Sequence, residues 1–284
     1  MQPIQIEIAG VGMRLLVRSW PDSEALRRFV GLFAPGPGTS ERPDVELVVE
    51  AADLRPEPVE GSPSEVEIQV DAQGRITYED RLLSGSLELG AAGAAGTFRV
   101  QPIPFVLAGM LRLVLSRVLL RRGGLLLHAS GVVRRGALHL FSGPSGSGKT
   151  TIASELLGGG EPFALDRVAL RVNGEGRWTG YATPFSDDEG RGMARSPGVP
   201  VQGLHFIEQS PRPFLQPLDR LDAVRKVLQN AAIDGRCAST DALVLEHAVS
   251  IAERVACYRL RFSRDSSFWV EIDRFAAERD GTRT

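Results

Sequence analysis

The stretch Gly143-Pro144-Ser145-Gly146-Ser147-Gly148-Lys149-Thr150 fits the pattern G-x-x-x-x-G-K-[ST] at every fixed position. An apolar segment at 137–141 precedes it, and a segment at 150–157 with the pattern of a helix follows it. A loop of this pattern between a strand and a helix is typical of phosphate binding. The stretch therefore predicts an α/β fold built around a phosphate-binding loop. The other interpretation is a glycine-rich turn that contains a lysine by chance.

Each residue type in the loop has a role in holding phosphate. Glycines let successive backbone N–H groups converge on an anion because no Cβ stands in the way, and the helix that follows adds the positive end of its dipole. Lys149 brings a compact charge to the β- and γ-phosphates, and the hydroxyl of Thr150 is a ligand for Mg²⁺. We therefore expect ATP and Mg²⁺ to bind here, with the nucleotide held by Gly143, Ser145, Gly146, Ser147, Gly148, Lys149, Thr150 and Thr151.

An acidic residue follows the loop in a second apolar segment. This segment, 163–172, has the pattern of a strand and contains Asp166. Phosphate-binding loops of this kind are often followed by an apolar strand that carries a Mg²⁺-binding carboxylate. We therefore expect Asp166 to hold Mg²⁺ and to act in catalysis. The alternative is a surface carboxylate paired with Arg167, which would contribute little.

His128 is the second candidate for a catalytic residue. It lies in an apolar segment at 125–133, and a short turn at 134–136 connects this segment to the one before the loop. Two strands joined by so short a turn form an antiparallel hairpin. In such a hairpin His128 lies at the end away from the turn, where the phosphate-binding loop begins. It can therefore face the nucleotide or the acceptor, although a histidine in the core or at a strand edge has the same pattern.

The chain divides into a β-rich N-terminal region, residues 1–104, and a core, residues 105–284, that contains the loop. In the first region the patterns predict strands at 5–8, 13–18, 45–50, 65–70 and 76–78, a helix at 23–33, and a flexible Ala/Gly connector at 90–96. In the second they predict strands at 179–183, 204–208 and 258–262, and helices at 105–120, 218–230, 240–255 and 267–277. The expected fold is α/β, with mixed or antiparallel strands around the nucleotide.

Composition argues against two classes of protein. Lys and Arg number 33 and Asp and Glu 35, and a formal net charge of −2 is unlike that of a nucleic-acid-binding protein. The most apolar segment, 105–120, is shorter than the about 20 residues that cross a bilayer, and it contains Arg112 and Arg117. No signal peptide is recognisable, and Cys237 and Cys257 are too few for a disulfide framework. We therefore expect a cytoplasmic protein that binds neither nucleic acid nor membranes.

The use of lysine supports a role for Lys149. Among the 33 basic residues, Lys149 and Lys226 are the two lysines, and the others are arginines. A compact ammonium and a planar guanidinium are not equivalent beside phosphate oxygens. A lysine at this position, in a chain that otherwise uses arginine, indicates a phosphate ligand. Lys226 lies in a predicted amphipathic helix and is interpreted as part of its solvated face.

The loop sequence alone is also similar to that of ABC-type ATPases. Those proteins carry a downstream LSGGQ-like signature and an apolar run that ends in Asp-Glu. Neither follows residue 150, and the stretch Leu83-Ser84-Gly85-Ser86 lies upstream, in the wrong order. The sequence therefore disfavours this class.

Several other short segments occur in a recognisable order. They are Leu-His-Ala-Ser at 127–130, Asp-Arg-Val at 166–168, Thr-Pro-Phe at 183–185, and further segments at 204–209, 215–228 and 258–262. This order resembles that of the HPr kinase/phosphorylase-like proteins, which include HPr kinase-related chains and chains resembling ATP-dependent phosphoenolpyruvate carboxykinase. The resemblance implies the fold of the HPr kinase C-terminal part and an ATP- and Mg²⁺-dependent kinase of a serine or related hydroxyl. It places His128 beside the active site and Asp166 in an acidic pair.

The sequence departs from that family at one position of the acidic pair. Leu165 precedes Asp166 where the family has a second aspartate, and the family's two acids divide base catalysis and metal binding between them. Two functions therefore stay open. One is a kinase whose acceptor is a hydroxyl on a protein, peptide or small molecule, with Asp187, Asp188 and Glu189 as an alternative source of a carboxylate. The other is a non-catalytic regulator or scaffold that binds ATP or GTP. The resemblance is also compatible with a homo-oligomer.

Overall fold

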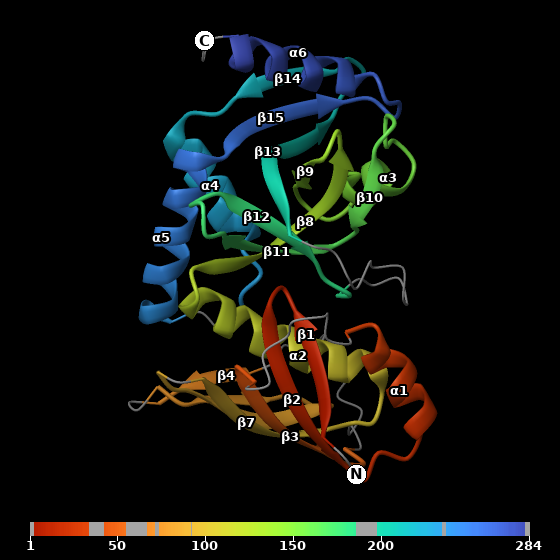
Figure 1. Ribbon diagram of the computed structural model, residues 1–284, viewed down its shortest axis with the longest axis vertical. Coiled ribbons are helices and arrows are strands. Elements are labelled where there is room, and N and C mark those ends of the chain that lie inside the picture. Colours follow the sequence, from red (N-terminus) through yellow and green to blue (C-terminus); the bar gives the residue numbers. More distant parts are fainter. Residues whose placement is uncertain are drawn as a thin grey trace. The chain divides into compact units, whose positions relative to one another are not determined.

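The computed structural model describes residues 3–33, 43–54, 67–71, 74–91, 93–185, 198–234 and 237–281. These residues form two compact units (Figure 1). The first comprises residues 1–122 with 233–241, and the second comprises residues 123–232 with 242–284. The chain thus enters the first unit twice.

The first unit is a seven-stranded mixed sheet with helix α2 packed across it and helix α1 beside α2 (Figure 1). Its strand order is β1-β2-β3-β7-β6-β5-β4, in which β2, β3 and β7 run parallel to one another. Buried residues alternate with more exposed ones along β2, as a sheet with one covered face requires. The elements are β1 (Ile4–Ile8), β2 (Val11–Arg18), α1 (Ser23–Gly31), β3 (Val45–Ala51), β4 (Glu67–Val70), β5 (Ile76–Glu79), β6 (Leu83–Leu89), β7 (Ala94–Val100) and α2 (Pro104–Arg121).

The Ala/Gly stretch at 90–96 is not the flexible connector that its composition predicted. Residues 94–96 belong to β7, which pairs with β6 over its whole length, and the Gly90 N–H donates to the Gly93 carbonyl at 2.8 Å just before this strand. Phe98 lies fully buried opposite Gly85, and a Cβ on Gly85 would lie 2.5 Å from its ring. A Cβ on Gly96 would lie 2.9 Å from the same ring. The small residues therefore belong to the sheet because they leave room for one large aromatic side chain.

Helix α2 confirms the helix that was predicted at 105–120. It buries most of its length, and two of its three arginines reach Asp234 of the segment that returns to the first unit. Arg117 is buried and donates to the backbone carbonyl of Asp234, whereas Arg112 Nη1 lies 3.6 Å from Asp234 Oδ2. In the part of the chain that the structure describes, no helix combines the length and the apolar character needed to span a membrane.

The second unit is built on an eight-stranded mixed sheet whose pairings close on themselves. β8 pairs with β11, β11 with β12, β12 with β13, β13 with β9, and β9 again with β8. With the first unit, this makes the chain an α/β protein with mixed sheets and a β-rich N-terminal part. The strands are β8 (Gly124–Arg134), β9 (Ala137–Ser142), β10 (Glu161–Ala164), β11 (Arg167–Val172), β12 (Trp178–Ala182), β13 (Val199–Gln209), β14 (Phe214–Pro217) and β15 (Ala256–Phe262). The helices are α3 (Lys149–Ser154), α4 (Arg220–Asn230), α5 (Ala238–Arg254) and α6 (Phe268–Gly281).

The predicted hairpin before the loop is confirmed. β8 and β9 are antiparallel, and Arg135 and Gly136 connect them with φ values of 53° and 77°. Positive φ at both central residues is the signature of the tight turn whose twist matches that of the two strands. Ser142, the last residue of β9, donates its hydroxyl to the carbonyl of His128 at 2.8 Å. His128 therefore lies beside the point where the chain leaves β9 for the loop.

Three strands of this unit run parallel and end at the same edge of the sheet. β13 is parallel to both β9 and β15, and Phe206 of β13 lies opposite Ser142 of β9. In the other pairing, Gln209 of β13 lies opposite Phe262 of β15. In α/β folds, both open and closed, ligands bind beyond the carboxyl ends of parallel strands. This edge is therefore the place to look for a site.

The segment at 163–172 is two strands rather than the one that its apolar pattern predicted. β10 pairs with residues 131–133 of β8, and β11 pairs with residues 124–128 of the same strand. Leu165 and Asp166 form the break between them. The register with β8 is the same on both sides of this break, since Ala164 lies opposite Gly131 and Arg167 opposite His128, and the register shift lies earlier, between Pro162 and Ala164. Asp166 itself lies outside both strands, beside His128.

Candidate functional site

The loop at 143–148 connects β9 to helix α3 with two residues in the left-handed region. Gly146 has φ 74° and Gly148, which caps α3, has φ 103°. Glycine adopts such values at little cost, whereas other residues are strained. A Cβ at Gly148 would lie 2.7 Å from Cζ of Phe262, at the end of β15. Both the backbone conformation and the close packing therefore require glycine at this position.

Lys149 is a buried cation at the start of α3. Its Nζ donates to the carbonyl oxygens of Gly143 and Pro144, at 2.9 Å each. Burial lowers the pKa of Lys149, the nearby Asp166 carboxylate opposes this change, and Arg167 adds to it. The hydroxyl of Ser130 donates to the backbone carbonyl of Lys149 at 2.8 Å. The lysine is thus fixed at the loop by β8 and by the loop itself.

The hydroxyl of Ser147 is a buried polar atom without a hydrogen-bond partner in the part of the chain that the structure describes. It lies inside the loop, where a Cβ on Gly143 would approach it to 3.0 Å. An unpaired buried hydroxyl costs free energy unless a ligand or water satisfies it. The glycines of the loop and Lys149 together fit an anion such as phosphate.

Asp166 is placed beside His128 by strand pairing. Arg167, the first residue of β11, lies opposite His128 of β8, and the Ala129 N–H donates to the Asp166 carbonyl at 3.1 Å. In this arrangement His128 Nε2 and Asp166 Oδ1 lie 2.9 Å apart. The other carboxylate oxygen forms an ion pair with Arg167. The side chains of His128, Asp166 and Arg167 are only partly exposed, so these contacts are shielded from water.

The surroundings of Asp166 keep it ionised. Burial on its own raises the pKa of this carboxyl, but the hydrogen bond from His128 and the charge of Arg167 outweigh it, and the pKa is lowered. A carboxylate with a lowered pKa is a weak base. Asp166 is therefore suited to accepting hydrogen bonds, orienting His128 and binding cations.

These groups share one pocket of about 360 Å³ in the second unit. The lining residues are His128, Ser145, Gly146, Gly148, Lys149, Thr150, Thr151, Asp166, Arg167, Gln209, Phe262 and Arg264. Eight of the ten site residues named from the sequence are among them. The other two, Gly143 and Ser147, form the base of the loop rather than the wall of the pocket. The loop and the His128–Asp166 pair, named from separate motifs, thus meet at one place.

Three lining residues were missed by the sequence analysis. Gln209 and Phe262 are the last residues of β13 and β15, and Arg264 follows two residues after β15. Gln209 Nε2 also donates to the Gly146 carbonyl at 3.3 Å. The signal that could have found them is their place at the ends of predicted strands after the loop. It could be used only with knowledge that these strands run parallel to β9.

The residues proposed for Mg²⁺ lie on the wall of this pocket. Thr150 is exposed, and both its side chain and the carboxylate of Asp166 line the cavity. Within the described ranges, no group of three or more His, Cys, Asp or Glu side chains is arranged as a metal site. Mg²⁺ in nucleotide sites uses one or two protein oxygens together with phosphate and water oxygens, so Thr150 and Asp166 fit this ion. The alternative acidic residues at 187–189 lie outside the described residues.

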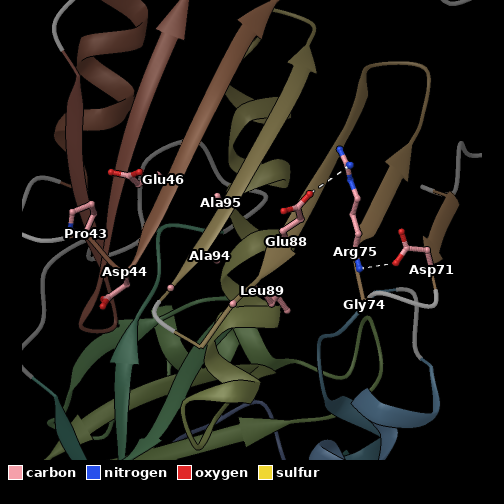
Figure 2. A pocket seen from close by; sticks show the side chains of 12 residues that line it. Pro43, Asp44, Glu46, Asp71, Gly74, Arg75, Glu88, Leu89, Ala94 and Ala95 are labelled. Carbon is pink, nitrogen blue, oxygen red and sulfur yellow. Dashed lines mark hydrogen bonds and ion pairs between the residues drawn. The ribbon is translucent and has the colours of Figure 1, made fainter.

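A larger pocket of about 710 Å³ lies in the first unit, far from these motifs in sequence (Figure 2). Its carboxylates already have partners. Glu88 pairs with Arg75 at 3.5 Å, and the backbone N–H of Arg75 donates to Asp71 Oδ1 at 2.9 Å. Glu46 pairs with Arg14 at 2.9 Å. Its lining residues are not arranged as a catalytic or phosphate-binding group. Its larger volume alone is therefore no reason to regard it as the functional site.

Comparisons with known proteins identify one family. The model of the family described as "SynChlorMet cassette protein ScmC" matches residues 104–278, beginning at the start of α2. No curated protein matches the chain.

Among solved structures, the chain is similar to one described as "Structure of the Hpr(Ser) kinase/phosphatase from Coxiella burnetii". The two are 12% identical, the similarity covers 56% of this chain and 99% of that chain, and the TM-score is 0.32. At these values the HPr kinase-like resemblance seen in the sequence stands as a distant fold relationship, and it carries no argument about activity. The family match covers more than half of the chain, and the chain therefore belongs to the family of SynChlorMet cassette protein ScmC.

Proposed function

We propose that this chain is a phosphotransferase that binds ATP and Mg²⁺ at residues 143–151. It transfers the γ-phosphoryl group to a serine or another hydroxyl on a protein, peptide or small molecule. The observation that carries the proposal is the shared pocket, which is lined both by the loop and by His128 with Asp166. A loop that only binds phosphate would not need the His128–Asp166 pair beside it.

The charge of the pocket supports a polyanionic ligand. Lys149, Arg167 and Arg264 are the cations of its lining, and Asp166 is its carboxylate. Three positive groups against one negative group leave an excess that suits a triphosphate with its metal ion. Helix α3 is short, so the positive charge of the pocket comes from these side chains rather than from the helix dipole.

The proposed reaction assigns the proton to His128. The bond between the γ-phosphorus and the β–γ bridging oxygen breaks, and its electron pair leaves with ADP. A bond forms between the acceptor oxygen and the γ-phosphorus, and the acceptor proton passes to the Nδ1 of His128. Asp166 accepts from Nε2–H at 2.9 Å and so selects the tautomer that leaves Nδ1 free to take the proton. Asp166 itself stays ionised because its pKa is lowered.

Thr150 and Asp166 are the proposed protein ligands of Mg²⁺. If these residues hold Mg²⁺, the ion would supply positive charge against the charge that develops on the phosphate oxygens during transfer. Lys149 brings a further positive charge to the phosphates. Positioning and charge stabilisation supply most of the catalysis of phosphoryl transfer. A chain with one acidic residue at this place is therefore a competent candidate.

One observation favours a second function, a nucleotide-binding regulator without turnover. Leu165 stands where the resembled family has a second acid, and its side chain packs against the apolar core of the second unit. Position 165 thus contributes to core packing rather than to catalysis. In this case ATP or GTP would bind at the same loop, and the γ-phosphoryl group would stay in place.

Nucleotide binding and turnover by the full chain separate the two functions. Binding is measured with a fluorescent ATP analogue, and turnover as ADP release with Mg²⁺ and serine-containing peptides. Lys149→Ala should weaken binding at least about tenfold because it removes a charge from the phosphates. Lys226→Ala is the matched control, since it removes the other lysine at a distance from the pocket. Asp166→Asn should lower turnover by about 10²–10⁴-fold, because it removes the carboxylate that orients His128 and is a proposed ligand of Mg²⁺.

The outcomes distinguish the kinase from the non-catalytic regulator. Equal nucleotide binding by the two lysine variants contradicts the phosphate-binding loop, and with it both functions. Tight binding by the wild type without ADP release or peptide phosphorylation supports the regulator. Turnover that survives Asp166→Asn unchanged would show that the His128–Asp166 pair is not the catalytic group.

A further inference from the structure

Arg264 is held at the pocket by the end of β15. It follows two residues after Phe262, whose ring packs against Gly148 of the loop. Its side chain is exposed and lines the pocket together with Lys149 and Asp166. The neighbouring Asp265 does not hold it, because this carboxylate accepts from the hydroxyl of Ser263 at 2.9 Å and from the backbone of Ser267 at 2.8 Å.

The other two cations of the pocket already have protein partners. Lys149 donates to two loop carbonyls, and Arg167 is paired with Asp166. Arg264 forms no ion pair with any residue that the structure describes. It is therefore the guanidinium of this lining that can take up an anionic ligand without breaking an existing ion pair.

We propose that Arg264 binds the γ-phosphate of the nucleotide and so makes the site selective for triphosphates over diphosphates. The proposal rests on the proposed nucleotide binding. The backbone of the loop serves the phosphates that ATP and ADP share, and Lys149 reaches the β- and γ-phosphates, whereas the outer oxygens of the γ-phosphate extend toward the groups of the pocket wall. A planar guanidinium matches two phosphate oxygens at once. Arg264 thus contacts the group that is transferred.

If the chain is a kinase, the contact between Arg264 and the γ-phosphate also stabilises the transition state of phosphoryl transfer. Charge spreads over the outer oxygens of the phosphoryl group as the bond to the bridging oxygen breaks, and an arginine placed there stabilises it. If the chain is a regulator without turnover, the same contact forms with ATP but not with ADP. Selectivity for the third phosphate is therefore expected whether or not the chain turns over.

The test compares the dissociation constants of two nucleotides for the full chain. The ligands are ADP and a non-hydrolysable ATP analogue, each with Mg²⁺, measured by calorimetry. The variants are Arg264→Ala and Arg264→Lys. Arg212→Ala is the matched control, because Arg212 is an exposed arginine that follows the end of the neighbouring strand β13 but does not line the pocket. Lys149→Ala serves as the variant that weakens both nucleotides.

We expect Arg264→Ala to raise the dissociation constant of the ATP analogue by about ten- to hundredfold. The constant for ADP should stay close to the wild-type value, so that the preference for triphosphate disappears. Arg264→Lys should recover only part of it, because an ammonium lacks the planar fork. Addition of free guanidinium should restore part of the lost affinity for the ATP analogue in Arg264→Ala, which a purely structural defect would not allow.

Three results would overturn the proposal. An equal loss for both nucleotides would make Arg264 a structural residue of the pocket, and no loss for either would remove it from the site. A loss in Arg212→Ala of the same size would show a general effect of surface charge. Failure of the wild type to bind either nucleotide is a different result, because it refutes the proposed function itself and the inference falls with it.

Discussion

Acidification should destabilise the second unit through a buried pair of histidines. His139 and His205 lie in its core with Nδ1 of His139 3.3 Å from Nε2 of His205. The ring of His205 stacks on those of Phe141 and Tyr258, and His139 meets Trp269 edge to face. Burial lowers the pKa of His139 to about 4, with Arg134 and Arg135 adding to the effect and Asp273 opposing it. Burial also lowers the pKa of His205 well below its ordinary value.

The sign and size of the effect follow from the pKa of His139. In the unfolded chain this histidine takes up a proton as the pH falls through about 6.5. In the folded chain it stays neutral until about pH 4. The free energy of unfolding therefore falls between these two values and is fully retained above the higher one. Going from about pH 7.5 to about pH 5 removes ~2 kcal/mol through His139, since one pKa unit is worth about 1.4 kcal/mol. His205 adds a loss of the same sign.

The assay is urea unfolding at the two pH values, followed by tryptophan fluorescence and circular dichroism. His139→Phe keeps an aromatic ring but removes the titrating group, so its loss on acidification should be smaller than that of the wild type by ~2 kcal/mol. Phe141→Leu is the control, because it loosens the same stack and keeps both histidines. It should be less stable at both pH values and should keep the full pH dependence. An unchanged pH dependence in His139→Phe would refute the reasoning.

Alanine substitutions at three glycines test the packing of the loop and of the segment that follows α3. Gly148→Ala should cost ~2–4 kcal/mol of stability and weaken nucleotide binding, because it combines positive φ with a contact of 2.7 Å to Phe262; thermal unfolding and analogue binding measure both effects. Gly158→Ala should cost more stability than Gly159→Ala, since both have positive φ but only a Cβ on Gly158 would meet the ring of Trp269, at 2.1 Å. Equal melting temperatures for these two variants would contradict the packing described here.

The loop and the hairpin could be predicted because local chemistry determines them. The spacing of Gly143, Gly148 and Lys149 describes a loop whatever surrounds it, and the turn at Arg135-Gly136 needs only positive φ at two residues. Alternation of apolar residues likewise predicted strands β1 to β5 of the first unit, because one face of that sheet is covered, but it did not predict β6 and β7. Each of these signals lies within a few residues along the chain.

The features that were not predicted from the sequence depend on contacts between segments that are distant along the chain. The break at Leu165 and Asp166 contains no glycine or proline, and it is recognised only from the pairing of β10 and β11 with two parts of β8. The glycines near Phe98 have the composition of a linker, and only the size of the opposite ring explains them. Gln209 and Arg264 reach the pocket through the parallel pairing of β9, β13 and β15, which a single sequence does not reveal.

The break in the strand also bears on the missing second acid. Asp166 leaves the ladder beside His128, while the adjacent Leu165 packs against the apolar core, so the two positions serve different surroundings. Among the residues of the pocket lining, His128 and Asp166 are the groups that can accept a proton. The lowered pKa of Asp166 makes its carboxylate a weak base, and its hydrogen bond instead orients the ring of His128. If the chain transfers phosphate, the base is therefore the histidine of the hairpin, and the loss of a carboxylate at 165 removes a function that the pair already supplies.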